Sequence, residues 1–211
     1  MKPAIGINDF LATKFEEYPF DGDFEQAFGL PEKNFKMMIY GPEKHGKTDF
    51  CVKFAKYISQ WGKVYYNSHE EGRSKTLRDC FIRNNMQEVA GKVMLLHKEP
   101  YEGMMERLAK KGSPRFLVID SLDYMELKEK QFKELVTTFP RKSIIMLSWC
   151  DAKEQPLRNA AKLIAKRVDI KCFVKNRTAY PTSRFGGNKS FVFGESMMKT
   201  QPGQQLTLIN S

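Results

Sequence analysis

The sequence predicts an α/β fold: a mostly parallel central sheet with helices on both faces and a small antiparallel C-terminal extension. Apolar runs such as 93–97 (VMLLH) lack an alternating polar face, which is typical of parallel strands covered on both sides. Segments with apolar residues at helical spacing, such as Phe50, Phe54 and Ile58, separate these runs. Shorter strand-like runs joined by turns follow Val168 and predict the antiparallel extension.

Helices and strands are expected to alternate along the chain. A buried strand at 35–40 precedes a helix at 49–61, which Gly62 ends. Glycine, serine and proline at 112–114 stop a later helix in the same way. The remaining helices are expected at 74–85, 101–111, 125–139 and 156–167, and the remaining strands at 63–68, 93–97, 115–120, 142–149, 168–174, 178–182 and 189–193.

The length and composition predict one globular domain. A chain of 211 residues is long enough for one α/β domain and too short for two. We expect an irregular N-terminal lead over 1–25 with aromatic residues packed on the domain's edge, a core domain over 26–194 and a polar tail over 195–211. No apolar run approaches the roughly 20 residues that span a bilayer. The first residues also lack the layout of a signal peptide, so we expect a cytoplasmic protein without a membrane partner.

Positive charge is concentrated late in the chain. The formal net charge is +10, and residues 151–211 hold 11 lysines and arginines against 4 acidic residues. Such an excess suits a polyanionic partner, because cationic side chains that displace counterions from phosphates drive nucleic-acid binding. Charge alone is equally compatible with a role in solubility.

A phosphate-binding loop, GPEKHGKT, lies at Gly41–Thr48 between the first buried strand and the following helix. Gly41 and Gly46 allow a tight turn that directs backbone N–H groups at phosphate oxygens. Lys47 is expected to reach the β and γ phosphates of ATP, and the Thr48 hydroxyl is expected to ligate Mg²⁺. The predicted nucleotide-binding residues are Gly41, Pro42, Glu43, Lys44, His45, Gly46, Lys47, Thr48 and Asp49.

Three carboxylates are placed to complete a nucleotide site. Asp120 ends the apolar run RFLVID, where a terminal carboxylate holds Mg²⁺ through water beside a phosphate-binding loop. Glu70 follows the next strand after that loop, where it could act on water as a general base. For Glu70 and its neighbour Glu71, the alternative is an acidic pair that complements a helix dipole.

These motifs resemble those of the RecA-like ATPases, which include recombinases, DnaB-type hexameric helicases, RadA and KaiC. The runs AFGLPEKNFKMMIYG and FLVIDSLD resemble the family's lead into its first core strand and its Walker B strand. The run VYYNSHEEGR resembles a family motif in which the first of two glutamates polarises the attacking water. It implies that role for Glu70, with Glu71 in support. The resemblance covers about residues 26–193.

The resemblance also implies contacts between subunits. KNR at 175–177 and SRFGG at 183–187 resemble the elements with which hexameric helicases and RadA reach into the neighbouring subunit's ATP site. A homo-oligomer, either a ring or a filament, is therefore implied. Lys175 with Arg177 or Arg184 would then stabilise transition-state charge across the interface. A solvated pair at a strand end is the alternative for Lys175 and Arg177.

Two more features follow from the resemblance. The chain carries Ser-Trp-Cys at 148–150, where the family commonly has a Gln or His that senses the γ phosphate. The family's DNA-contacting loops correspond to 122–130 and 151–159, and the second of these leads into a basic helix. A helix face that is simply exposed to solvent is the alternative. The predicted nucleic-acid contacts are Lys153, Arg158, Lys162 and Lys166.

The sequence thus predicts an oligomeric, Mg-ATP-dependent ATPase that binds single-stranded DNA and acts in recombination, repair or replication, together with other proteins of those processes. One alternative is a nucleotide-binding module with little turnover that holds DNA or a partner protein, and the missing Gln or His favours it. A second alternative is a small-molecule phosphotransferase, for which Arg107 and Arg115 lie near the expected acceptor region.

Overall fold

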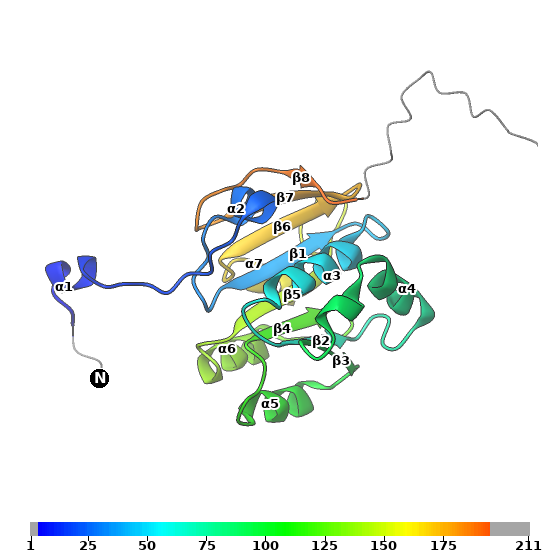
Figure 1. Ribbon diagram of the computed structural model, residues 1–211, viewed down its shortest axis with the longest axis horizontal. Coiled ribbons are helices and arrows are strands. Elements are labelled where there is room, and N and C mark those ends of the chain that lie inside the picture. The colour runs from blue at the N-terminus through cyan, green and yellow to red at the C-terminus, as the bar shows by residue number, and fades with distance from the viewer. Residues whose placement is uncertain (1–3, 195–211) are drawn as a thin grey trace, which may run out of the picture.

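In the computed structural model, which describes residues 4–194, strands and helices alternate along the chain as the sequence predicts (Figure 1). The strands are β1 (Lys36–Gly41), β2 (Val64–Ser68), β3 (Val93–His97), β4 (Phe116–Asp120), β5 (Ser143–Trp149), β6 (Ile170–Lys175), β7 (Thr178–Ser183) and β8 (Phe191–Val192). The helices are α1 (Ile7–Leu11), α2 (Gly22–Phe28), α3 (Lys47–Ile58), α4 (Lys75–Arg83), the 3-10 helix η1 (Met86–Val89), α5 (Tyr101–Ala109), α6 (Glu129–Thr138) and α7 (Asn159–Ala165).

The eight strands form one sheet in the order β3-β2-β4-β5-β1-β6-β7-β8. The first six strands of that order are parallel to one another, and β7 and β8 extend the sheet as antiparallel strands. The predicted fold class is therefore confirmed. The polar tail predicted at 195–211 lies outside the described residues.

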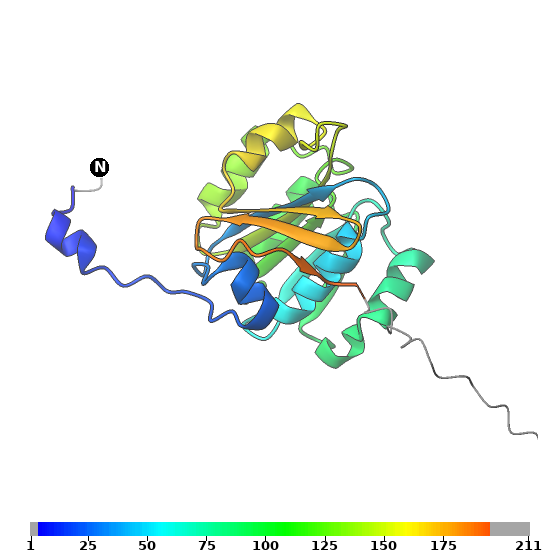
Figure 2. The same cartoon turned by 90° about the horizontal axis from the view of Figure 1, so that it is seen from above.

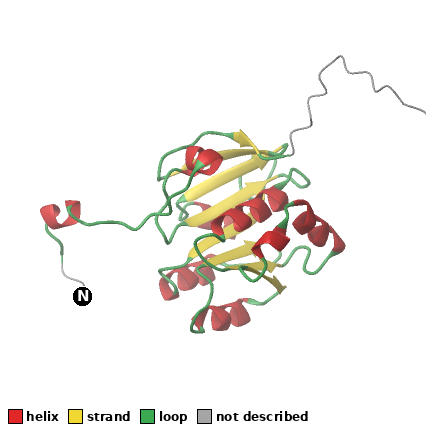
Figure 3. Cartoon of the chain, viewed as in Figure 1, coloured by secondary structure: helices red, strands yellow, loops and turns green. Residues whose placement is uncertain are grey.

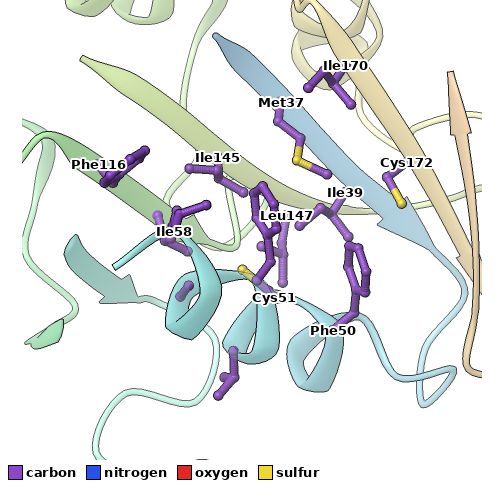
Figure 4. Packing of buried hydrophobic residues seen from close by; sticks show 14 of the residues in the cluster. Met37, Ile39, Phe50, Cys51, Ile58, Phe116, Ile145, Leu147, Ile170 and Cys172 are labelled. Atoms are coloured by element: carbon purple, nitrogen blue, oxygen red, sulfur yellow. The ribbon is translucent and has the colours of Figure 1, made fainter. Parts of the chain in front are cut away.

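Helices cover both faces of the sheet (Figures 2 and 3). On one face, α2, α3 and α4 contribute to a large aromatic-rich core, and on the other face α5, α6 and α7 contribute to a second, smaller core. The helical spacing of apolar residues explains how α3 packs, because Phe50, Phe54 and Ile58 are all fully buried in the main core. Phe50 and Ile58 point toward the sheet (Figure 4). They pack against strand residues that include Ile39 and Leu147.

The N-terminal lead is more ordered than predicted. It contains α1 and the start of α2, and Tyr18 and Phe20 lie within the main core rather than at its edge. The seven-residue α2 is too short for a clear periodic pattern. By contrast, Phe10 and Phe15 are exposed on a segment that extends away from the domain (Figures 1 and 2).

Across the described part of the chain, none of the helices has both the length and the apolar character that crossing a membrane requires.

Candidate nucleotide site

The phosphate-binding loop joins the carboxyl end of β1 to the start of α3, at the edge where all the parallel strands end. Lys44 and Gly46 have φ angles of 61° and 97°, so two residues of the loop adopt the left-handed backbone conformation. A Cβ atom on Gly41 would lie 2.1 Å from the carbonyl oxygen of Val174, so no other residue fits there. The loop and the neighbouring strand β6 are thus packed backbone to backbone.

Lys47 lies inside this loop. Its side chain is only 8% exposed, and its amine donates a hydrogen bond to the carbonyl oxygen of Pro42 at 2.7 Å. Burial lowers the pKa of the Lys47 amine, and the negative charge of Glu70 opposes that shift. The backbone of the phosphate-binding loop therefore already fixes the position of the Lys47 amine before any phosphate binds.

Asp120 ends β4 and faces the same loop. It is 1% exposed, and the Tyr66 hydroxyl donates a hydrogen bond to its Oδ2 at 2.7 Å. Its other oxygen, Oδ1, is buried and has no hydrogen-bond partner within residues 4–194. Burial raises the pKa of Asp120 to about 7, while the hydrogen bond from Tyr66 lowers it. A buried carboxylate oxygen with an unused lone pair is a suitable acceptor for a metal-bound water.

Glu70 and Glu71 follow β2, next to the end of β4. The Glu70 backbone N–H donates to the Asp120 carbonyl oxygen at 3.1 Å, which ties this loop to β4. Burial raises the pKa of the Glu70 carboxyl, and the nearby Lys47 amine partly offsets this. The Glu71 carboxylate instead accepts hydrogen bonds from the hydroxyls of Ser74, at 3.0 Å, and Thr76. Glu71 therefore holds the residues at the start of α4 through these hydroxyls, and the helix-dipole alternative stays a prediction.

These groups open into one cavity of about 540 Å³. This volume falls in the range of small-molecule sites, which is about 300–1,000 Å³. The predicted site residues that line it are Glu43, Lys44, Gly46, Lys47, Thr48, Asp49, Glu70, Glu71, Asp120 and Arg177. The cavity also borders Arg83, Tyr124 and Trp149, which the sequence did not indicate as nucleotide contacts.

No protein-family model matches the sequence, and the search of curated proteins gave no match either. Among solved structures, the chain resembles an ATPase domain, with 13% identity and a TM-score of 0.54 over 76% of this chain and 82% of that domain. It also resembles a KaiC-like protein from Pyrococcus horikoshii, with 16% identity and a TM-score of 0.58 over 86% of this chain and 99% of that one.

A third similar structure is the flagellar accessory protein FlaH from Methanocaldococcus jannaschii, with 15% identity and a TM-score of 0.53 over 84% of each chain. All three similarities extend over at least three quarters of this chain. The fold is RecA-like. At these identities the comparison concerns the fold, and the chemistry of the site rests on this chain's own residues.

Within this RecA-like domain, Arg177 lies beside the phosphate-binding loop of its own chain. It occupies the tight turn between β6 and β7, and its N–H donates to the carbonyl oxygen of His45 at 3.1 Å. Its guanidinium donates to Asp49 Oδ2 at 3.0 Å, and Asp49 is buried in the first turn of α3. Asn84, which follows α4, donates to the other Asp49 oxygen at 2.8 Å. Asp49 therefore orients the arginine.

The other two predicted transition-state cations are placed differently. Lys175 donates to Glu154 at 2.7 Å, and neither residue lines the cavity. Arg184 pairs with Asp169 at 3.5 Å, and Asp169 also accepts the N–H of Lys36 at the start of β1. Arg184 thus lies at the opposite edge of the sheet from the phosphate-binding loop. Because one chain is described, the prediction that these residues serve a neighbouring subunit stays a prediction.

The predicted nucleic-acid contacts are only partly free. Lys162 pairs with Asp151 at 2.9 Å, and Arg158 pairs with Glu126 of the other predicted contact loop at 3.4 Å. Lys153 and Lys166 are exposed. The two loops therefore neutralise part of each other's charge, which the separate charge counts of the sequence could not reveal.

Trp149 is the last residue of β5, the strand at whose end the RecA-like family commonly has a Gln or His. Its ring lines the cavity and packs edge-on against Tyr124, with ring centroids 5.1 Å apart. Its backbone N–H donates to Asp123 Oδ2 at 2.8 Å, and the Ser148 hydroxyl donates to its carbonyl oxygen at 3.1 Å. This strand therefore offers the cavity an aromatic wall where the RecA-like family commonly has a polar sensor.

Proposed function

We propose that the chain is a Mg-ATP-dependent ATPase. The observation that carries the proposal is the convergence of Lys47, Thr48, Glu70 and Asp120 in one cavity at the carboxyl edge of the sheet. A basic amine, a hydroxyl and two carboxylates around a phosphate-binding loop are the groups that nucleotide hydrolysis requires. The RecA-like fold supports this proposal, since one of the similar solved structures is an ATPase domain.

Each residue has a distinct role in the proposed reaction. Backbone N–H groups of the loop and the Lys47 amine bind the phosphates, and the Thr48 hydroxyl and the free Asp120 Oδ1 fit the coordination shell of Mg²⁺. Magnesium would neutralise phosphate charge when bound. Glu70 accepts the proton of the attacking water, and its raised pKa makes it a better base than an exposed glutamate.

Arg177 supplies a further positive charge to the nucleotide site from the same subunit. Its guanidinium is already oriented by Asp49 beside the loop, so it can bind a phosphate oxygen with little loss of side-chain entropy. Lys175 is paired with Glu154 and does not line the cavity. Arg184 lies at the opposite edge of the sheet, so a homo-oligomer would be needed to bring it to a phosphate.

Coupling to nucleic acid is the second part of the proposal. The net charge of +10 and the exposed cations Lys153 and Lys166 support binding of single-stranded DNA by a ring or filament of subunits. Recombination, repair and replication are the processes that such an ATPase would serve. The three structural neighbours are an ATPase domain, a KaiC-like protein and a flagellar accessory protein, so the comparison does not choose among these processes.

A nucleotide-binding module with little turnover is the second candidate. Trp149 stands where a polar sensor would be expected, and this favours nucleotide binding without efficient hydrolysis. A phosphotransferase is less well supported, because Arg107 pairs with Glu99 at 3.0 Å and neither it nor Arg115 lines the cavity.

Binding and turnover of ATP, measured together, separate the two candidates. We expect wild type to bind a fluorescent ATP analogue in the presence of Mg²⁺ and to release phosphate, and Lys47→Ala to do neither. Tight binding without phosphate release, at any concentration of single-stranded DNA, would favour the binding module. Transfer of phosphate only in the presence of a small-molecule acceptor would favour the phosphotransferase.

A further inference from the structure

Four adjacent strands of the sheet are each preceded by a basic residue. Lys92, Lys63, Arg115 and Lys142 stand directly before β3, β2, β4 and β5, which are neighbours in that order. The N–H groups that begin β2, β4 and β5 donate to the carbonyls of Lys92, Lys63 and Arg115 at 2.8, 3.2 and 3.1 Å. Because adjacent strands lie about 4.8 Å apart, these residues form a row about 14 Å long. We call them, with Arg141, the amino-edge row.

The charge of this row is not compensated by ion pairs. No member forms an ion pair with another residue among 4–194. The segments 61–63, 91–92, 110–115 and 140–142 contain no acidic residue, and two further lysines stand at 110–111. Burial lowers the pKa of Lys142, and the charge of Arg115 lowers it further. Cations are thus held together where an anion would relieve their repulsion.

A hollow of about 400 Å³ lies within the row. Phe139 and Pro140 give it an apolar lining, and Arg115, Arg141 and Lys142 line its other sides. The Lys142 amine lies 5.8 Å from the centre of the Phe139 ring. An aromatic ring framed by cations offers a base a surface for stacking and its phosphates a set of counter-charges.

We propose that the amino-edge row binds single-stranded nucleic acid along the start of the parallel strands. A lipid surface fits less well, because none of the large exposed hydrophobic side chains of residues 4–194 belongs to the row or its hollow. The surface ends toward β1, where Arg115 and Arg141 also line a second hollow with Glu16 and Glu32, and where Glu16 pairs with Lys33 at 3.5 Å. It extends the proposed nucleic-acid function to a face that is separate from the loops at 122–130 and 151–159.

The row is remote from the nucleotide site. Five-residue strands such as β2 and β4 separate the two edges, which corresponds to about 17 Å. Binding at the row therefore needs no nucleotide, and it is expected to persist when the Lys47 amine is removed. This property distinguishes it from any contact that the nucleotide-bound loops make.

The test compares three double variants with equal loss of charge. Arg115→Gln/Arg141→Gln removes two exposed members of the row, Lys153→Gln/Lys166→Gln removes the exposed cations of the opposite edge, and Arg73→Gln/Arg78→Gln is a control on α4 and the loop before it. Binding of a fluorescent oligothymidylate is measured by anisotropy at low salt without nucleotide. Circular dichroism and melting curves check that each variant is folded.

We expect the Arg115/Arg141 variant to bind at least tenfold more weakly than wild type and the control to stay within twofold. The slope of log affinity against log salt should fall by about 1.4 in the Arg115/Arg141 variant, since each lost phosphate contact on a single strand contributes about 0.7. An oligonucleotide with abasic sites should bind wild type more weakly than the intact one, because it cannot stack on Phe139.

Three outcomes would overturn the inference. If only the Lys153/Lys166 variant loses affinity, the loops carry binding and the proposed function survives without the row. If polyglutamate competes as well as the oligonucleotide, the row binds acidic polymers or proteins in general. If wild type binds no oligonucleotide, both nucleic-acid proposals fail, while phosphate release still reports separately on the ATPase.

Discussion

The two edges of the sheet hold charge in opposite ways. At the carboxyl edge, Lys47 and Asp120 are 8% and 1% exposed and are held by Pro42 and Tyr66. At the amino edge, Arg115 and Arg141 are exposed and form no ion pair within the described residues. Buried charges are costly but geometrically fixed, which suits chemistry on one bound molecule. Solvated charges carry little desolvation cost and their side chains can change conformation, which suits binding of a long polyanion.

The largest expected effect is at the carboxyl edge. Glu70→Gln should lower phosphate release by about 10²–10⁴-fold while ATP still binds, because an amide cannot accept the proton of water. Wild-type turnover should rise with pH, with a midpoint above the usual range for glutamate, since burial raises the pKa of Glu70. Steady-state phosphate release against pH measures both effects.

Glu71→Gln is the matched comparison for that variant. The Glu71 carboxylate bonds the hydroxyls of Ser74 and Thr76, so the change should cost less than about tenfold in turnover and should lower the melting temperature slightly. Equal losses in the two variants would contradict the assignment of Glu70 as the base.

Burial of Asp120 should make the free energy of unfolding depend on pH. Its pKa is raised from 3.8 to about 7 in the folded protein, so the folded state binds more protons between these values than the unfolded state does. Stability of the ligand-free protein should therefore fall as the pH rises from 4 through 7, by at most about 4 kcal/mol.

Asp120→Asn removes that titration. The variant should melt at a higher temperature than wild type at pH 8, by an amount that shrinks toward pH 4, and it should lose phosphate release. Denaturation curves over this pH range, without nucleotide or Mg²⁺, provide the measurement. A pH-independent difference between the two proteins would show that Asp120 keeps an ordinary pKa.

The role of Arg177 predicts an intermediate effect. Arg177→Ala should weaken binding of ATP about tenfold, or about 1.4 kcal/mol, even at dilutions where the protein is monomeric. Fluorescent ATP titrations, with sedimentation to establish the monomer, measure this, and Arg73→Ala is the exposed control. Unchanged affinity in the monomer, with loss of turnover only in the oligomer, would show that the arginine serves a neighbouring subunit.

The smallest effect concerns the paired cations of the carboxyl edge. Glu126→Gln releases Arg158 from an exposed ion pair of 3.4 Å, so unfolding free energy should change by less than about 0.5 kcal/mol. Affinity for the oligothymidylate should rise no more than about twofold, as one additional cation becomes available. A larger gain would indicate that these loops are a main binding surface that ion pairing holds in check.

The fold, and the grouping of residues at the centre of the candidate site, could be predicted because their signals are local. The loop at Gly41–Thr48 carries its chemistry in eight consecutive residues, and apolar runs such as β4 and β5 identify buried parallel strands without tertiary information. The carboxylates Glu70 and Asp120 follow directly, because parallel strands place their ends along one edge.

What the sequence did not reveal depends on contacts between distant residues. Asp49 meets Asn84 and Arg177, which are 35 and 128 positions away, and no local pattern links the three. The amino-edge row is similar, because single cations before four strands align only once the strand order is known. The basic excess of residues 151–211 predicted nucleic-acid contacts there, but several of these cations are paired with acidic residues.

Phosphate release from Mg-ATP, measured for wild type and Lys47→Ala over a range of single-stranded DNA concentrations at low salt, tests the central claim most directly. The proposed ATPase predicts turnover by wild type that rises several-fold with DNA and is abolished by the substitution. Wild type that binds ATP but releases no phosphate at any DNA concentration, or equal release by both proteins, would contradict it.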